Sequence, residues 1–507
     1  MHDILPKSKW LVSAALFGFC VGPTFISYQP YLFRWDDTEY LLRSIAVSRA
    51  FWSGNLHGLG AAMVSIRLPA MTVLGVPWGP LVSWDGAGKC FITLDAMISL
   101  LAAFCLYLLL RIGVKPLFLV VASVCVFASI GPYPQRADAH IAATAFLSDN
   151  LLAWTILAAV LLIPYEARTH CPSIRGAFVR GIVWGAIMSL GAMTKISFLY
   201  FVVVIVPILL FIRLHYDGLR PALASLSACA CSSSPVVIYL IRWGGRAFYQ
   251  AKSASFGQWA GFYYTSLWQF FGNTVRESPG LVLSVALTAT GLIYLVIKKR
   301  TILLGPDFLA LLIMIGFSIV VLWSPSRLIR YSFPAIMAFP FLTAILMSGK
   351  GQSVPGRSAA LTAGLVFCGL LVAVVPTRHR PLRQSLSRCD AVLAQAAKCN
   401  AKRITLATDS PTLNKNLMDL DIEVSTPGAP IEVSTLAYQA MSDVPIEADF
   451  RAISESDLVV FQDRDASSSA PFTNQRASEY ERYTREVGYV PVRVGDDIGV
   501  YTIRCDP

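Results

Sequence analysis

The chain has 507 residues, of which 55% are hydrophobic and only 14% are charged, and its mean hydropathy is +0.58. An ordinary soluble chain has about 25% charged residues, so folded soluble domains could not cover this much apolar surface. The composition also excludes a disordered chain, a collagen and a disulfide scaffold, and no short repeat runs along the sequence. It therefore predicts a polytopic membrane protein.

The net charge of +11 is unevenly distributed. The first 377 residues carry 27 basic and 12 acidic residues, whereas residues 378–507 carry 15 basic and 19 acidic ones. The basic excess lies in short segments between apolar runs, and no basic stripe or nucleic-acid-reading motif accompanies it. We therefore expect the bilayer, and no nucleic acid, as a partner.

Eleven apolar runs are close to the roughly 20 residues that a helix needs to cross a bilayer. They cover residues 10–28, 91–110, 116–131, 141–163, 179–194, 196–212, 221–241, 280–297, 302–323, 333–348 and 358–376. The first run follows Lys7 and Lys9 but lacks a convincing signal-peptidase site, so we expect it to remain as a helix.

Alternate loops between these runs are basic, which marks the cytoplasmic side of a membrane protein. The residues are Arg111, Lys115, Arg168, Arg175, Arg180, Arg213, Arg220, Lys298, Lys299, Arg300, Lys350 and Arg357. The pattern predicts a cytoplasmic N-terminus and, after eleven helices, a C-terminus on the outer side. If the membrane is a bacterial inner membrane, that side is the periplasm.

Three segments are predicted to face outward: the long first loop at 29–90, a loop at 242–279 and everything after Pro376. The second is so rich in Trp, Tyr and Phe that we expect interfacial helices lying on the bilayer. The chain thus divides into a transmembrane domain, 1–376, and an extracytoplasmic domain, 377–507.

The tail changes from apolar runs to short α/β patterns. Asp409-Ser410-Pro411 resembles a helix N-cap. The other predicted elements are strands at Ala401–Thr408 and Ser456–Gln462, an amphipathic helix at Glu479–Val487, and a hairpin of Val490–Val494 with Ile498–Arg504. No dinucleotide fingerprint occurs, so a structural or acceptor-docking role is expected.

Most of the eleven cysteines are single residues within the apolar runs. If 382–397 is one helix, Cys389 and Cys399 lie about 15 Å apart along it, whereas a disulfide needs Cα atoms within about 7 Å. Either is therefore expected to pair more readily with Cys505. No CxxC or HExxH metal spacing occurs.

Three of the twelve acidic residues of the membrane half fall within four positions, as Asp36, Asp37 and Glu39, followed by Tyr40. Neighbouring carboxylates repel when ionised, and partial burial would raise the pKa of at least one of them. A carboxylate in this state suits a general base, or a ligand for an amine or a cation. The alternative is a solvated helix start, because acidic residues favour first turns.

Further polar residues are predicted at the same outer face. Asp149 follows Ser148 near the outer side of the fourth run, and Lys195 lies in the turn between the fifth and sixth. Arg67 precedes Pro69 in the first loop, and Arg330 and Tyr331 precede the tenth run. Each alone could cap a helix or extend to the headgroups, but together they suit an anionic phosphate held near a basic carboxylate.

This layout resembles the polytopic GT-C glycosyltransferases that use polyprenyl-phosphate sugars, such as protein O-mannosyltransferases and the lipid A aminoarabinose transferase. The resemblance spans about residues 30–340, and it depends on the set of motifs more than on any one. The motifs are Asp36-Asp37-Thr38-Glu39-Tyr40, Arg67-Leu68-Pro69, Ser148-Asp149-Asn150-Leu151-Leu152, Thr194-Lys195 and Arg330-Tyr331-Ser332-Phe333-Pro334.

The resemblance implies a mainly α membrane protein with a small C-terminal α/β domain. It implies that Asp36 deprotonates the acceptor, which then attacks the anomeric carbon with inversion, although Asp37 could be the base instead. Arg67, Lys195 and Arg330 would bind the donor phosphate, and Asp149 would position the donor sugar or the acceptor. The implied partners are a polyprenyl-phosphate-sugar donor and an extracytoplasmic lipid, glycan or protein acceptor.

Two other classes remain open. A transporter or lipid flippase should place ionisable groups near the bilayer midplane and repeat its halves, whereas here the charges gather at one face. A structural scaffold leaves the acidic triplet unexplained. No cofactor is implied with certainty, but Asp36, Asp37 and Asp149 could bind a divalent cation.

Overall fold

The computed structural model describes most of the chain in two compact units. The helical unit comprises Met1–Tyr28, Val64–Met71 and Ile92–Arg378, and the mixed unit comprises Gln29–Met63, Thr72–Phe91 and His379–Pro507. The described residues are 4–22, 35–63, 68–81, 84–130, 148–256, 266–277, 282, 285–286, 288–290, 293, 297, 305–323, 329–349, 351–377, 387–408, 410, 413–426, 428–436, 446–462, 471–494 and 498–502.

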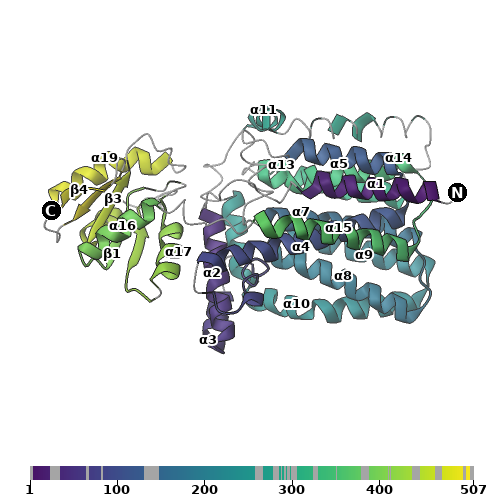
Figure 1. The fold of residues 1–507 in the computed structure, drawn as a ribbon, viewed down its shortest axis with the longest axis horizontal. Coiled ribbons are helices and arrows are strands. Elements are labelled where there is room, and N and C mark those ends of the chain that lie inside the picture. The colour runs from purple at the N-terminus through teal and green to yellow at the C-terminus, as the bar shows by residue number, and fades with distance from the viewer. Residues whose placement is uncertain are drawn as a thin grey trace. The chain divides into compact units, whose positions relative to one another are not determined.

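The helical unit is built from long apolar helices that lie side by side (Figure 1). They are α1 (Ile4–Val21), α4 (Trp84–Ile112, which begins in the mixed unit), α5 (Pro116–Ile130), α7 (Ser148–Arg168), α8 (Ile174–Thr194), α9 (Leu199–Tyr216), α10 (Leu219–Phe256), α13 (Pro306–Trp323), α14 (Phe333–Ser348) and α15 (Gly356–Thr377). Short elements join them: α11 (Leu267–Glu277) and the 3₁₀ turns η3 (Ile196–Phe198) and η5 (Ile329–Ser332).

The predicted polytopic membrane protein is confirmed. Among the described residues, seven helices are long and apolar enough to cross a membrane, and three shorter apolar helices accompany them. Together they correspond to ten of the eleven predicted runs; most of the run at 280–297 lies outside the described residues.

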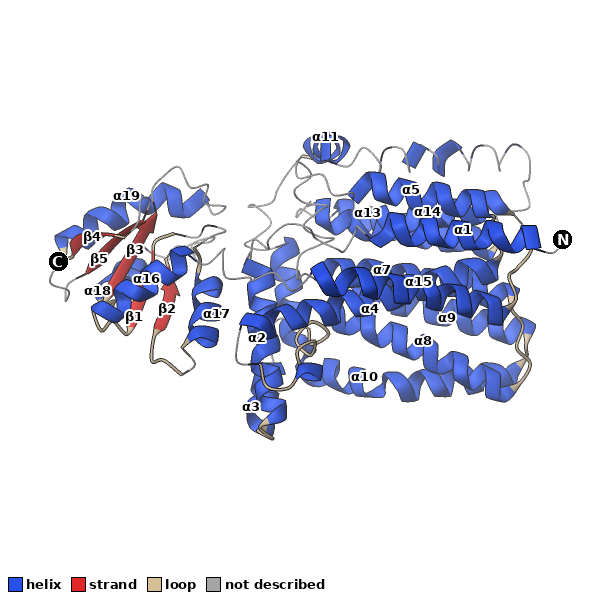
Figure 2. Cartoon of the chain, viewed as in Figure 1, coloured by secondary structure: helices blue, strands red, loops and turns tan. Residues whose placement is uncertain are grey.

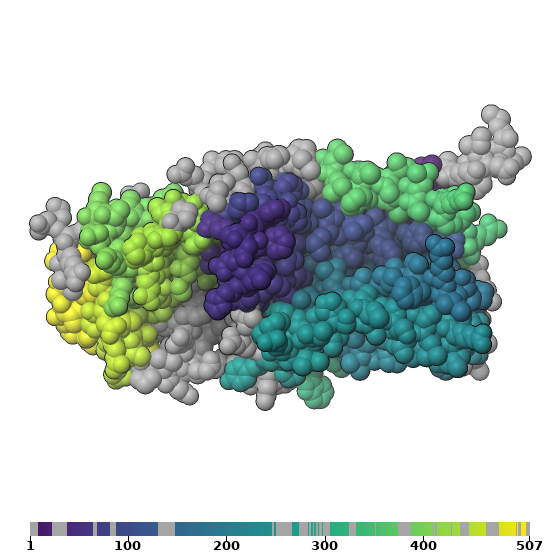
Figure 3. All heavy atoms as spheres, turned by 90° about the horizontal axis from the view of Figure 1, so that it is seen from below, coloured from purple at the N-terminus to yellow at the C-terminus, as the bar shows by residue number. Residues whose placement is uncertain are grey.

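Helix α7 is the centre of this unit. Its span is 94% buried, against 17% for that of α15, because α8, α9, α13 and α14 all pack against it. Its Trp154 is fully buried and meets Phe17 of α1 edge-on. The peripheral helices expose apolar side chains instead, including Ile241 of α10. The atoms of α10, teal in Figure 3, cover part of the face shown there. Such a surface suits contact with lipid chains.

Helices α8 and α10 approach closely through small residues. A Cβ on Gly181 would lie 2.2 Å from the carbonyl oxygen of Ser225, and one on Gly185 would lie 1.9 Å from Oγ of Ser232. Both glycines therefore exclude any side chain, as at other small-residue contacts between membrane helices. The close contact fixes the middle of α8, directly after Arg180, which is discussed below.

The aromatic segment predicted as an outer loop at 242–279 is partly helical. Helix α10 continues through its start to Phe256, and α11 follows from Leu267. Phe270 of α11 packs on Leu322 while Trp268 is 85% exposed. This amphipathic arrangement fits the predicted interfacial helix.

The mixed unit combines the first loop with the C-terminal domain (Figure 2). The loop supplies α2 (Trp35–Trp52), α3 (Leu56–Met63) and the 3₁₀ turn η2 (Val76–Trp78). The tail supplies α16 (Ser387–Lys398), β1 (Arg403–Leu406), α17 (Lys415–Ser425), β2 (Glu432–Thr435), α18 (Ile446–Ser454), β3 (Leu458–Gln462), α19 (Pro471–Glu486), β4 (Val490–Arg493) and β5 (Ile498–Thr502).

The tail forms one sheet in the order β2-β1-β3-β5-β4, in which β1 pairs in parallel with β2 and β3, and β5 pairs antiparallel with β3 and β4. This confirms the predicted small α/β domain and its final hairpin. Tyr480 and Tyr489 are buried in its core. Burial and the nearby Asp449 carboxylate raise the pKa of the Tyr480 phenol, which stays protonated and donates to that carboxylate at 2.5 Å.

Two details of the tail differ from or refine the predictions. The predicted cap at Asp409-Ser410-Pro411 is wrong, because α17 is capped by Asn414, whose side chain accepts from the amide of Leu417 at 3.0 Å. Ser410 instead accepts from the amide of Leu413 at 3.0 Å and closes a turn before the helix. Cys399 forms a disulfide, whereas Cys389 is a buried thiol outside any disulfide.

Arg49 joins the first loop to the tail within the mixed unit. Its guanidinium pairs with the carboxylate of Glu423 on α17 and donates to the carbonyl oxygens of Glu423, at 3.1 Å, and Leu81, at 2.5 Å. The charged side chain is partly buried, so these bonds are worth more than an exposed ion pair.

We expect Arg49→Ala to loosen this junction. Loss of three charge-assisted bonds at a partly buried site should raise amide hydrogen exchange in α2 and α17 about tenfold, which corresponds to about 1.4 kcal/mol. Arg403→Ala is the control, because Arg403 and Glu432 form an exposed pair at 3.9 Å. Equal exchange in both variants would show that Arg49 does not hold the junction.

Candidate functional site

The acidic triplet lies in the first turns of α2. Asp36 and Asp37 are the second and third residues of this helix, and their side chains are outside the described set. A helix start stabilises carboxylates through its dipole and free amides, so this position agrees both with an ionised base and with a plain helix-start role.

Glu39 and Tyr40 are less available than the sequence indicates. The Glu39 carboxylate pairs with Arg43 one turn along α2 at 3.1 Å, and its side chain is 17% exposed. Tyr40 is buried. Because its charge is balanced by a local partner, Glu39 is a weaker candidate for proton transfer than Asp36 or Asp37.

At the start of α7, Ser148, Asp149 and Asn150 are all buried. A buried carboxylate requires a charged or hydrogen-bonding partner, and Asp149 has one in Lys195, whose Nζ lies 2.8 Å from its Oδ1. Asp149 is 6% exposed and Lys195 is 32% exposed. The pair thus presents its cationic side, and not its carboxylate, to the surroundings.

The local backbone places Lys195 in this position. Helix α8 ends at Thr194, and Lys195 follows in an extended conformation while its amide still donates to Gly191 at 3.1 Å. The 3₁₀ turn η3 begins directly afterwards. A cation at a helix C-terminus is stabilised by the helix dipole, which compensates part of the cost of ordering the lysine.

Tyr331 completes the group. The Lys195 ammonium lies 4.8 Å from the centroid of the Tyr331 ring, within the range of a cation–π contact. Tyr331 belongs to η5, and Arg330 precedes it in the same turn, although the side chain of Arg330 is not described. We call Asp149, Lys195 and Tyr331 the outer cluster.

Arg67 itself lies outside the described residues, but the residues after it contact the same region. The amide of Ala70 donates to the carbonyl of Met193 at 3.1 Å, two residues before Lys195. Leu68 packs in an apolar cluster with Tyr239 and Met193. The segment that follows Arg67 is therefore attached to the turn that carries Lys195.

The outer cluster is suited to binding an anion. The Lys195 ammonium has three donor hydrogens and is partly exposed, so a phosphate oxygen could accept from it beside Asp149. Among the described side chains, no three acidic, histidine or cysteine residues form a metal-binding group. The side chains of Asp36 and Asp37 lie outside the described residues, so a divalent cation there stays a prediction.

The sequence did not predict a second charged group at the other end of α7. Glu166 pairs with Arg180 at 2.8 Å and with Arg213, which also pairs with Asp217. Arg180 and Arg213 were expected in basic loops, but Arg213 is 0% exposed. The spacing of Arg213 and Asp217, one helical turn apart, is the sequence signal that could have indicated the pair.

No protein-family model matches the sequence, and no curated protein matches it significantly. Solved structures match it along nearly its whole length. ArnT from Cupriavidus metallidurans bound to undecaprenyl phosphate is 12% identical, with a TM-score of 0.51 over 97% of this chain and 96% of that one. The Archaeoglobus fulgidus oligosaccharyltransferase tethered with an acceptor peptide containing the NVT sequon is 12% identical, with a TM-score of 0.50 over 98% and 74%. At this identity the likeness shows a shared fold.

Proposed function

We propose that this protein is an integral-membrane inverting glycosyltransferase that moves a sugar from a polyprenyl-phosphate donor to an acceptor at the outer face of the membrane. The outer cluster carries this proposal, because it brings together three residues from the sequence motifs at 148–152, 194–195 and 330–334. The shared fold with ArnT, whose structure contains undecaprenyl phosphate, supports the class of donor.

Each residue has a defined role in the proposed reaction. Asp36, or Asp37 in its place, takes a proton from the acceptor hydroxyl or amine. The acceptor then attacks the anomeric carbon, and the bond from that carbon to the phosphate oxygen breaks. Lys195 neutralises the charge that develops on the departing phosphate, with Arg67 and Arg330 as further cations. Asp149 holds the Lys195 ammonium in position.

The proposed orientation has the N-terminus in the cytoplasm of a bacterial cell and the C-terminal domain in the periplasm. Two observations support it: the basic loops of the sequence and the disulfide at Cys399, since disulfides persist in oxidising compartments. The transporter alternative has less support, because the described acidic residues of α7 lie at its two ends rather than near its middle.

The proposal is tested by transfer of radiolabelled sugars from a panel of polyprenyl-phosphate donors in proteoliposomes, with lipid A, glycan and peptide acceptors. We expect Lys195→Gln to raise the KM for the donor roughly 10-fold to 100-fold, because a charge-assisted bond to phosphate is lost. Lys115→Gln is the matched control, since Lys115 is exposed and precedes α5; its KM should stay within twofold of wild type.

Two results would contradict the proposal. Absence of transfer from every donor in the panel, with vectorial uptake of a solute by the same proteoliposomes, would favour the transporter. If the KM for the donor is unchanged in both Lys195→Gln and Lys115→Gln, the outer cluster is not part of the donor site.

A further inference from the structure

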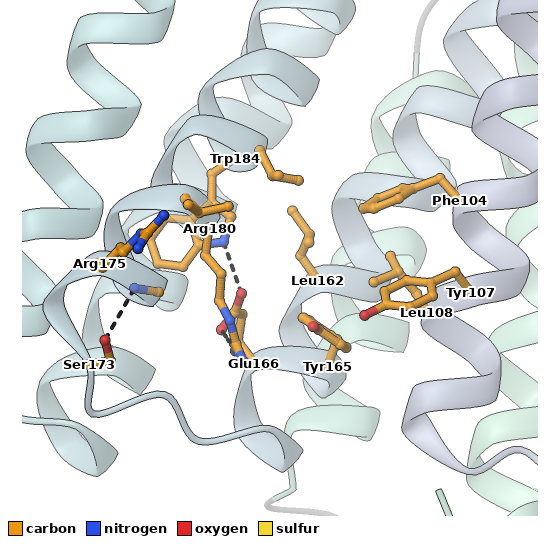
Figure 4. Close-up of a pocket in the computed structure, with 13 residues that line it drawn as sticks. Phe104, Tyr107, Leu108, Leu162, Tyr165, Glu166, Ser173, Arg175, Arg180 and Trp184 are labelled. Atoms are coloured by element: carbon orange, nitrogen blue, oxygen red, sulfur yellow. Dashed lines mark hydrogen bonds and ion pairs between the residues drawn. The ribbon is translucent and has the colours of Figure 1, made fainter. Parts of the chain in front are cut away.

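A cavity of about 510 Å³ lies at the end of α7 opposite to the outer cluster (Figure 4). It is bounded by α4, α7 and α8 near the basic loops that the sequence places on the cytoplasmic side. The volume is within the range of small-ligand pockets. The lining residues that matter here are Phe104 and Tyr107 of α4, Glu166 of α7, and Arg175, Val179 and Arg180 of α8.

The acidic residue of this cavity is already neutralised. The Glu166 carboxylate accepts from Arg180 at 2.8 Å and from the indole Nε1 of Trp184 at 3.1 Å, and it pairs with the buried Arg213. Figure 4 shows the side chains of Arg180 and Trp184 both directed at Glu166. Glu166 is 1% exposed, so it presents little negative charge to a ligand.

The charge that remains is positive. Arg180 and Arg213 balance Glu166 and Asp217, whereas Arg175 is exposed and makes no ion pair with any residue whose side chain the structure describes. The carbonyl and hydroxyl of Thr169 also accept from Arg180, at 2.6 and 3.0 Å, and hold this guanidinium at the cavity. The cavity therefore combines a fixed arginine with a free one at its edge.

The remaining walls are largely apolar. Phe104, Tyr107 and Val179 line them, and Val179 is 54% exposed. Tyr107 lies five residues before the end of α4, which is about 8 Å along the helix. Arg175 is the second residue of α8, and the guanidinium of Arg180 reaches back to Thr169, which follows the end of α7. The cavity thus has charged groups near the ends of the helices and an apolar wall deeper in the bundle. This order matches a lipid, whose headgroup lies at the membrane surface and whose acyl chain lies in the interior.

We propose that this cavity is a binding site for an anionic glycerophospholipid of the leaflet on the basic side. The phosphate lies between Arg175 and Arg180, and one acyl chain lies along Phe104, Tyr107 and Val179. Charge decides between lipid classes: an anionic headgroup complements Arg175, which pairs with no described carboxylate, whereas a zwitterionic headgroup brings a cation of its own. Basic pockets between membrane helices on the cytoplasmic side commonly take such headgroups.

The test is lipid binding to the full-length protein in dodecyl maltoside, counted by native mass spectrometry. Dioleoyl phosphatidylglycerol is compared with dioleoyl phosphatidylcholine, which has the same chains. We expect the anionic lipid to bind about tenfold more tightly. Arg175→Gln should weaken it about fivefold, the effect of one basic charge at a membrane surface, and should leave phosphatidylcholine unchanged.

Two further variants separate the site from general effects. Val179→Trp fills the apolar wall and should weaken both lipids, while Arg220→Gln removes an exposed arginine from the start of α10 and should change binding less than twofold. Equal binding of the two lipids, or equal effects of Arg175→Gln and Arg220→Gln, would overturn the proposal. Full displacement by 10 mM inorganic phosphate would instead show a soluble-anion site.

Discussion

Asp36→Asn is expected to lower kcat for sugar transfer by about 10²-fold to 10⁴-fold, the usual contribution of a general base. The substitution keeps the size and hydrogen-bonding shape of the side chain but removes its ability to take a proton. Binding of the donor should be unchanged, because the phosphate-binding role is proposed for Lys195 and the arginines. The measurement is kcat in proteoliposomes, with donor binding followed separately.

Asp37→Asn and Glu39→Gln are the controls for this result. They lie in the same turns of α2, and Glu39 already pairs with Arg43 at 3.1 Å, so both variants should keep kcat within about tenfold of wild type. If Asp37→Asn gives the large loss instead, Asp37 is the base. If all three variants transfer as well as wild type, the triplet only stabilises the start of α2, and the base is elsewhere.

Arg213→Leu is expected to destabilise the helical unit by about 3–5 kcal/mol, as for other buried pairs that lose one partner. Arg213 is fully buried and pairs with both Glu166 and Asp217. With leucine at this position, the buried carboxylates of Glu166 and Asp217 both lose their ion pair with Arg213. The measurement is the free energy of unfolding in mixed micelles, followed by tryptophan fluorescence.

The double variant Arg213→Leu with Glu166→Gln separates charge from packing. It removes one of the two stranded carboxylates and should recover about half of the lost stability. Arg220→Gln, at an exposed position, should change stability by less than about 0.5 kcal/mol. If Arg213→Leu has the same free energy of unfolding as Arg220→Gln, the buried ion pairs of Arg213 make no net contribution to stability.

The membrane helices could be predicted because a lipid environment demands long uninterrupted apolar runs. Helix boundaries were less predictable: α10 continues through Trp243 into the aromatic segment that the sequence indicated as loop. In the tail, β2 was missed because it has four residues, of which only Val433 is buried, so no alternating pattern marks it. The cap at Asn414 was missed because an earlier Ser-Pro sequence carries the same signal.

The outer cluster was predictable in membership but not in geometry. Asp149, Lys195 and Tyr331 each lie at a helix end, and the topology assigned those ends to one face. The sequence could not show that Asp149 and Lys195 form a pair, because 46 residues separate them. The second charged group, Arg213 and Arg180 with Glu166 and Asp217, was missed for another reason. A buried arginine has the same sequence context as a loop arginine, and only packing distinguishes the two.

Helix α7 carries a charged contact at each end, Asp149 with Lys195 and Glu166 with Arg180 and Arg213. These carboxylates are seventeen residues apart, about 26 Å along the axis. Sliding α7 by one turn, about 5.4 Å, would break both contacts at once and bury unpaired charge at two depths. The two contacts therefore fix the position of α7 along its axis. Motion of α7 in this direction is disfavoured, and any movement that admits the proposed lipid-linked sugar must come from other segments.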